Sequence, residues 1–73
     1  MLFRRIRDLR EDKDLNQSAI AGYLGIDQST YSGYELGKVN VPIEALMKLA
    51  DFHSVSLDYL TGRTNVKQAY PKE

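Results

Sequence analysis

Residues 17–38 read QSAIAGYLGIDQSTYSGYELGK, and this stretch has the pattern of two short helices joined by a tight turn. Ala21 is small enough for a second helix to cross over it, and Gly25 accepts the left-handed backbone angles that such a turn needs. Apolar residues suited to fill the angle between the two helices flank the turn on both sides: Ile20, Leu24, Ile26, Tyr31 and Tyr34. The stretch therefore predicts two helices that pack at a steep angle across the joint Gly25-Ile26-Asp27.

Outside this stretch the apolar residues also recur at helical spacing. They predict one helix over residues 2–13 and two further helices, one starting near Pro42 and one near Ser56. The predicted inward stripe of the fourth helix is Ile43, Leu46, Met47, Ala50 and His53. Residues suited to begin or end the helices stand at the expected places: Asn16, Gly25, Asp27, Gly37, Pro42, Ser56 and Gly62. No segment alternates with a period of two, so we expect a compact all-α fold of about five helices.

Length and composition limit the classes of protein that fit. The chain has 73 residues and no cysteine, which allows one domain and excludes a disulfide-rich scaffold. Ten Lys and Arg balance ten Asp and Glu, so a generally polybasic binder of RNA or membranes is disfavoured. No apolar run is long enough to span a bilayer, and we expect a cytoplasmic protein. The predicted domain covers residues 1–66, and residues 67–73 are predicted to form a flexible tail.

The two-helix pattern is that of a helix-turn-helix, and the stretch quoted above resembles this motif in the lambdoid repressor and Cro class of bacterial and phage regulators, the XRE-like family. The likeness extends outward to Arg10 and Leu15-Asn16-Gln17 on one side, and to the segments 46–50 and 55–60 on the other. It covers roughly residues 3–63. The resemblance implies a lambda-repressor-like domain that binds double-stranded DNA.

On a helical wheel the third helix has one polar face and one aromatic face. The polar face carries Gln28, Ser29 and Ser32, with Gly33 and Leu36 beside them. A major groove admits such a helix, and the Gln28 amide can pair with adenine N6 and N7 together. Ser29 and Ser32 can reach base edges or phosphates, or be simply exposed. Leu36 can contact a thymine methyl group or a second subunit, or be an ordinary exposed leucine.

The resemblance assigns further roles. It implies that Gln17, at the start of the second helix, and Lys38 and Asn40, after the third, contact the DNA backbone. It also implies an ion pair between Arg10 and Glu35, whereas Arg10 on a phosphate is the alternative. The other arginines of the first helix, Arg4, Arg5 and Arg7, are interpreted as a solvated face.

Gly33 departs from the family, in which this position commonly carries a longer side chain. Two readings stay open for Gly33: a close approach of the backbone to a sugar-phosphate or a thymine methyl group, or a relaxed position.

The resulting prediction is a sequence-specific DNA-binding transcriptional regulator, a repressor that acts as a homodimer on an inverted repeat. The predicted DNA contacts are Gln17, Gln28, Ser29, Ser32, Gly33, Lys38 and Asn40. No catalytic residues, metal site or cofactor are predicted, because no nucleophile–base pair stands out and the chain has one histidine and no cysteine. His53 is interpreted as a core residue. The alternative is a module that binds a protein partner, such as an antitoxin, which the zero net charge and Gly33 favour slightly.

Overall fold

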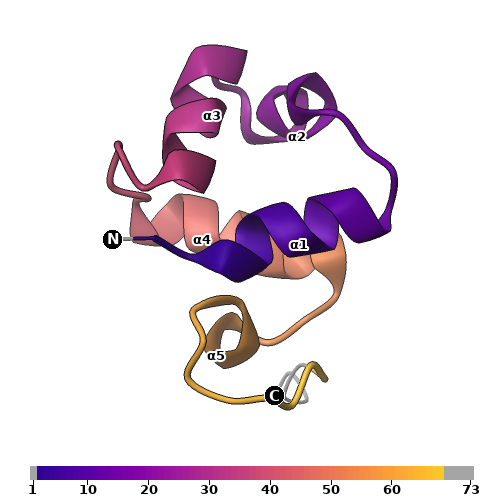
Figure 1. The fold of residues 1–73 in the computed structure, drawn as a ribbon. Coiled ribbons are helices and arrows are strands. Elements are labelled where there is room, and N and C mark those ends of the chain that lie inside the picture. Colours follow the sequence, from indigo (N-terminus) through magenta and orange to yellow (C-terminus); the bar gives the residue numbers. More distant parts are fainter. Residues whose placement is uncertain (1, 69–73) are drawn as a thin grey trace.

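The computed structural model describes residues 2–68, which form five α-helices and no strand (Figure 1). The helices are α1 (Arg4–Asp12), α2 (Gln17–Leu24), α3 (Gln28–Leu36), α4 (Ile43–His53) and α5 (Leu57–Leu60). In Figure 1, α2 and α3 stand together at one end of the molecule and α5 lies at the other, with α1 and α4 between them. The predicted all-α class is confirmed.

The helix starts test the predicted capping residues. The Asn16 and Ser56 side chains each accept a hydrogen bond of 2.9 Å from a backbone N–H in the first turn of α2 and α5. These two caps are confirmed. Asp27 is the N-cap residue of α3, as predicted, but its side chain makes no capping hydrogen bond. Asp27 still stands at the start of α3, because its backbone carbonyl accepts from the N–H of Tyr31 at 3.1 Å.

The joint between α2 and α3 has the predicted geometry. Gly25 has a φ of 71°, a left-handed conformation that costs glycine little. Ile26 donates its backbone N–H to the carbonyl of Ala21 at 3.0 Å, which closes the end of α2. Ala21 and Tyr31 are buried between the helices. α3 therefore packs against α2, and one side of α3 remains exposed to solvent.

The core comes from all five helices. Its buried apolar residues are Ile6, Leu9, Ile20, Ala21, Leu24, Tyr31, Tyr34, Leu46, Leu49, Ala50, Val55 and Leu60. On α4 the predicted inward positions of Ile43 and Met47 are wrong, because these side chains are 58% and 54% exposed. The inward face is formed instead by the buried residues of α4, which are Leu46, Leu49, Ala50 and His53. At 100° per residue, Ile43 and Met47 lie roughly 70° and 110° from the centre of that face.

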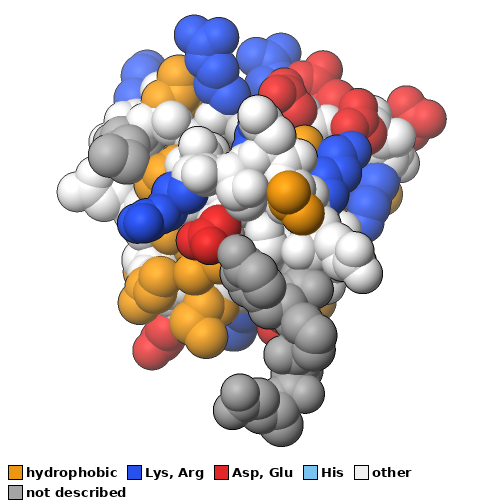
Figure 2. Space-filling view, turned by 90° about the horizontal axis from the view of Figure 1, so that it is seen from below, with side chains coloured by type: hydrophobic (Ala, Val, Ile, Leu, Met, Phe, Trp, Pro, Cys, Tyr) orange, Lys and Arg blue, Asp and Glu red, His pale blue; other side chains and the backbone are white. Residues whose placement is uncertain are grey.

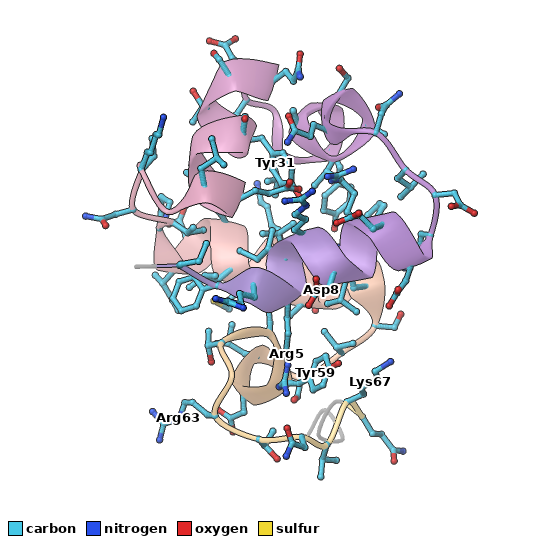
Figure 3. The ribbon with its side chains drawn as sticks, viewed as in Figure 1. Arg5, Asp8, Tyr31, Tyr59, Arg63 and Lys67 are labelled. Carbon is cyan, nitrogen blue, oxygen red and sulfur yellow. The ribbon has the colours of Figure 1, made fainter. Side chains whose placement is uncertain are left out.

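Arg5 is not part of a solvated face. Its guanidinium donates to the backbone carbonyls of Tyr59 at 2.8 Å and Thr64 at 2.5 Å, and to the Asn65 side chain at 2.7 Å. It also lies over the Tyr59 ring, 4.0 Å from the ring centre (Figure 3). Arg5 thus joins α1 to α5 and to the segment that follows, a contact that corrects the interpretation from sequence.

The segment after α5 folds back on the domain. The carbonyl of Lys67 accepts a hydrogen bond of 2.8 Å from the backbone N–H of Ser56. The rest of the predicted tail, residues 69–73, lies outside the described residues. Among the helices of residues 2–68, none is long and apolar enough to cross a membrane.

Candidate nucleic-acid interface

α3 presents one polar, accessible face and buries the other. Gln28 and Ser29 are exposed and Ser32 is half-buried, whereas Tyr31 and Tyr34 lie in the core. Figure 3 shows Tyr31 between α3 and the helices beneath it. The predicted division of this helix into a polar and an aromatic face is therefore confirmed.

An ion pair fixes α3 to α1. Arg10 Nε donates to Glu35 Oε2 at 2.6 Å, and a second guanidinium nitrogen donates to Glu35 Oε1 at 3.0 Å. A third hydrogen bond of 2.8 Å joins Arg10 to the carbonyl of Leu15, so the loop before α2 is held as well. The two side chains are only 14% and 3% exposed. The pairing that the resemblance implies is confirmed.

The surroundings of this pair keep both groups charged. Burial opposes ionisation of Glu35, but hydrogen bonds from Arg10 and Gln17 outweigh it and hold the pKa of this carboxyl below its usual value. The hydrogen bond to Glu35 likewise raises the pKa of Arg10. The pair is therefore a bidentate ionic contact at neutral pH, the strongest form of charge-assisted hydrogen bond in proteins.

Gln17 extends the network to the polar face of α3. Its amide nitrogen donates to Glu35 Oε1 at 3.1 Å, and its amide oxygen accepts from Gln28 Nε2 at 3.2 Å. Because a carboxylate only accepts, Gln17 must turn its NH₂ group toward Glu35 and its oxygen toward Gln28. Gln28 must then use one N–H for Gln17. Its amide oxygen and second N–H stay available, the pair of groups that adenine recognition requires.

The loop after α3 carries the remaining predicted contacts. Lys38 and Asn40 are both exposed there. Gly33 is buried instead, and a Cβ added to it would lie 2.5 Å from Cγ2 of Val39. This crowding is a reason for glycine that sequence reasoning did not consider. The predicted role of Gly33 in DNA binding stays a prediction.

Charge is not concentrated on the α5 side of the molecule. Figure 2, which views the domain from that side, shows basic and acidic side chains intermixed rather than one basic surface. Within residues 2–68, no three His, Asp or Glu side chains lie close enough together to hold a metal ion. On and beside α3, the exposed polar side chains named above carry amides, a hydroxyl and the ammonium group of Lys38.

The comparison with known families decides the class of this domain. A helix-turn-helix family model matches residues 6–60, which include all five helices almost entirely. The chain belongs to the helix-turn-helix family.

Two relatives illustrate what the helix-turn-helix chain is similar to. It is 41% identical over 68 residues to the HTH-type transcriptional regulator AnsR of Bacillus subtilis, a match that covers 93% of the chain and 59% of AnsR. It is 37% identical over 70 residues to the cryptic phage CTXphi transcriptional repressor RstR of Vibrio cholerae, covering 93% of the chain and 63% of RstR. The chain thus spans about three fifths of the length of these relatives.

The family and these relatives agree with the Cro-type, XRE-like resemblance, which is confirmed. They are transcriptional regulators rather than enzymes, in agreement with the prediction that the chain is not an enzyme. Sequence did not predict the hydrogen bonds of Gln17 to Glu35 and to Gln28, or the packing of Val39 on Gly33. A small residue on an exposed helix face was a signal for the packing of Val39.

Proposed function

We propose that this helix-turn-helix domain binds double-stranded DNA in a sequence-specific manner by placing α3 in the major groove, and that it regulates transcription as a repressor. The observation that carries the proposal is the network from Arg10 through Glu35 and Gln17 to Gln28. It holds an exposed amide at the start of α3, where recognition helices meet base edges. The names of AnsR and RstR support regulation and repression.

Each predicted contact has a role in this arrangement. Gln28 reads adenine through its amide oxygen and free N–H. Ser29 and Ser32 lie farther along the same helix and reach base edges or phosphates. Three contacts reach the DNA backbone from either side of α3: Gln17 from α2, and Lys38 and Asn40 from the following loop. Gly33 is buried beneath Val39, so its proposed part in DNA binding is to leave room for that side chain on the helix.

The proposed active form is a homodimer on an inverted repeat. One recognition helix reads too few base pairs to find a single operator, whereas two subunits related by a two-fold axis read two half-sites. Such half-sites are centred about one helical turn apart, roughly 34 Å. The proposed contact between subunits is the connection from α4 to α5 and the start of α5, residues 54–59.

Selection of bound duplexes from a random DNA pool tests this function directly. The expected result is one enriched motif that occurs as two inverted copies with centres about 10 base pairs apart. Enrichment of no motif would contradict the proposal. Specific capture of a protein partner together with no preference among DNA sequences would instead support the alternative of a partner-binding module.

The affinity of the domain for DNA is expected to depend on salt concentration more weakly than is usual for protein–DNA complexes. Each phosphate neutralised contributes about −0.9 to the slope of log K against log salt, and Lys38 is the predicted cationic contact. Lys38→Ala should flatten the slope by about one unit per subunit and weaken binding to all sequences alike. Arg63→Ala, which removes an exposed cation after α5, is the control and should leave the slope unchanged. A wild-type slope near −10 would contradict this expectation.

A further inference from the structure

Val39 lies on the helix that is proposed to read DNA, although it belongs to the following loop. The loop turns back beside α3 (Figure 1), and the carbonyl of Gly33 accepts backbone hydrogen bonds from Lys38 at 3.0 Å and Val39 at 3.2 Å. A Cβ on Gly33 would stand 2.5 Å from Cγ2 and 3.2 Å from Cβ of Val39. The valine side chain therefore occupies the space that a side chain at position 33 would fill.

This space belongs to the accessible face of α3. Gly33 follows Ser29 by four residues, so the two positions are neighbours along one side of the helix. Ser29 is exposed, whereas Tyr31 and Tyr34 face the core. Gly33 is buried on the accessible side because Val39 covers it, and Val39 itself is 40% exposed. The face thus continues from a polar first turn into an apolar patch formed by a loop residue.

We propose that Val39 is a specificity-determining residue that contacts the 5-methyl group of a thymine in each half-site. This inference rests on the proposed function, because it requires α3 to lie in the major groove. An aliphatic side chain has no hydrogen bond to offer a base edge, and the thymine methyl group is the one apolar group that the major groove presents. Val39 thereby supplies the reading that Gly33 cannot.

Leu36 is the other apolar side chain on this part of α3, and its surroundings differ. It is 57% exposed but lines a shallow cleft with Leu2 and Arg4, on the side of the helix that faces α1. Val39 instead covers Gly33, one turn after Ser29. Its position is also fixed, because two backbone hydrogen bonds to Gly33 hold the loop in place.

The test combines protein and DNA variants. In an operator selected with the wild-type protein, each thymine is replaced in turn by uracil, which removes only the methyl group. One particular thymine in each half-site is expected to respond. Its replacement in a single half-site should weaken wild-type binding about fourfold, the effect of burying one methyl group. Its replacement in both half-sites should weaken binding about fifteenfold. For Val39→Ala the same replacement should change affinity less than twofold.

Two further variants sharpen the result. Gly33→Ala must displace Val39 and should therefore lose the same thymine dependence, although residue 39 is unchanged. Val66→Ala removes a 62% exposed valine after α5 and should keep the full dependence. Melting temperatures of all variants are measured, so that a loss of fold is separated from a loss of reading.

The outcomes separate this inference from the function on which it rests. If wild-type protein binds its operator but Val39→Ala keeps the wild-type dependence on every thymine, Val39 reads no base while the proposed function stands. If wild-type protein prefers no DNA sequence, both proposals are overturned together. A methyl effect that disappears in Val39→Ala and Gly33→Ala, but persists in Val66→Ala, establishes the contact.

Discussion

Glu35→Ala is expected to lower the free energy of unfolding by about 3 kcal/mol, because it leaves the Arg10 guanidinium without its partner in a site that is largely closed to water. A domain is stable by only about 5–15 kcal/mol, so this loss is large. The measurement is urea denaturation at pH 7. Glu35→Gln, which keeps the shape and part of the hydrogen bonding, should lose less.

The exposed pair Arg7–Glu11 provides a matched control. Its atoms are 2.7 Å apart, as close as those of the buried pair, but its side chains are 60% and 52% exposed. Glu11→Ala should therefore cost less than about 1 kcal/mol. Equal and small losses in Glu35→Ala and Glu11→Ala would show that the Arg10–Glu35 pair does not stabilise the domain.

His53 is expected to make the stability of the domain fall as the pH drops below about 6.5. Both ring nitrogens are buried without a hydrogen-bond partner among residues 2–68. Burial, aided by the nearby charge of Lys13, lowers the pKa of His53 from 6.5 to about 4. Between pH 6.5 and pH 4 the His53 side chain is therefore protonated in the unfolded chain but neutral in the folded domain. The stability present above pH 6.5 is lost progressively as the pH falls toward 4.

The loss between pH 7.5 and pH 5 should be on the order of 2 kcal/mol by urea denaturation. His53→Leu removes the one histidine of the chain and should flatten this dependence. Measurements stay above pH 5 so that Glu35, whose contribution is lost at lower pH, remains ionised. A wild-type profile as flat as that of His53→Leu would show that His53 is protonated equally in both states.

Local signals in the sequence were sufficient to predict most of the fold. The spacing of apolar residues located all five helices, and Asn16, Gly25 and Ser56 marked boundaries because their roles depend on backbone geometry within one turn. The stripe of α4 was misplaced at Ile43 and Met47, since a helical wheel does not reveal which side of a broad apolar face the neighbouring helices cover. Family resemblance, rather than spacing, implied the Arg10–Glu35 pair.

The contacts that sequence did not predict join residues without a shared periodic pattern. Arg5 donates a hydrogen bond to Asn65, a residue far from it in the sequence. From sequence, the charge of Arg5 indicated only a solvated face. Val39 reaches Gly33 because the loop turns back, a path that depends on the positions of α3 and α4 together. The Gln17–Gln28 hydrogen bond likewise needs the crossing angle of α2 and α3. Such contacts follow from the assembled fold.

The central claim is that α3 reads DNA bases through Gln28, and the most direct test is the ratio of specific to non-specific affinity for Gln28→Ala. Gln28 is exposed, so this variant should keep the wild-type melting temperature. Its affinity for the selected operator should fall by about 1–3 kcal/mol, while its affinity for unrelated DNA should stay nearly constant. The ratio is therefore expected to drop about five- to 150-fold. An unchanged ratio in the folded variant would contradict the account.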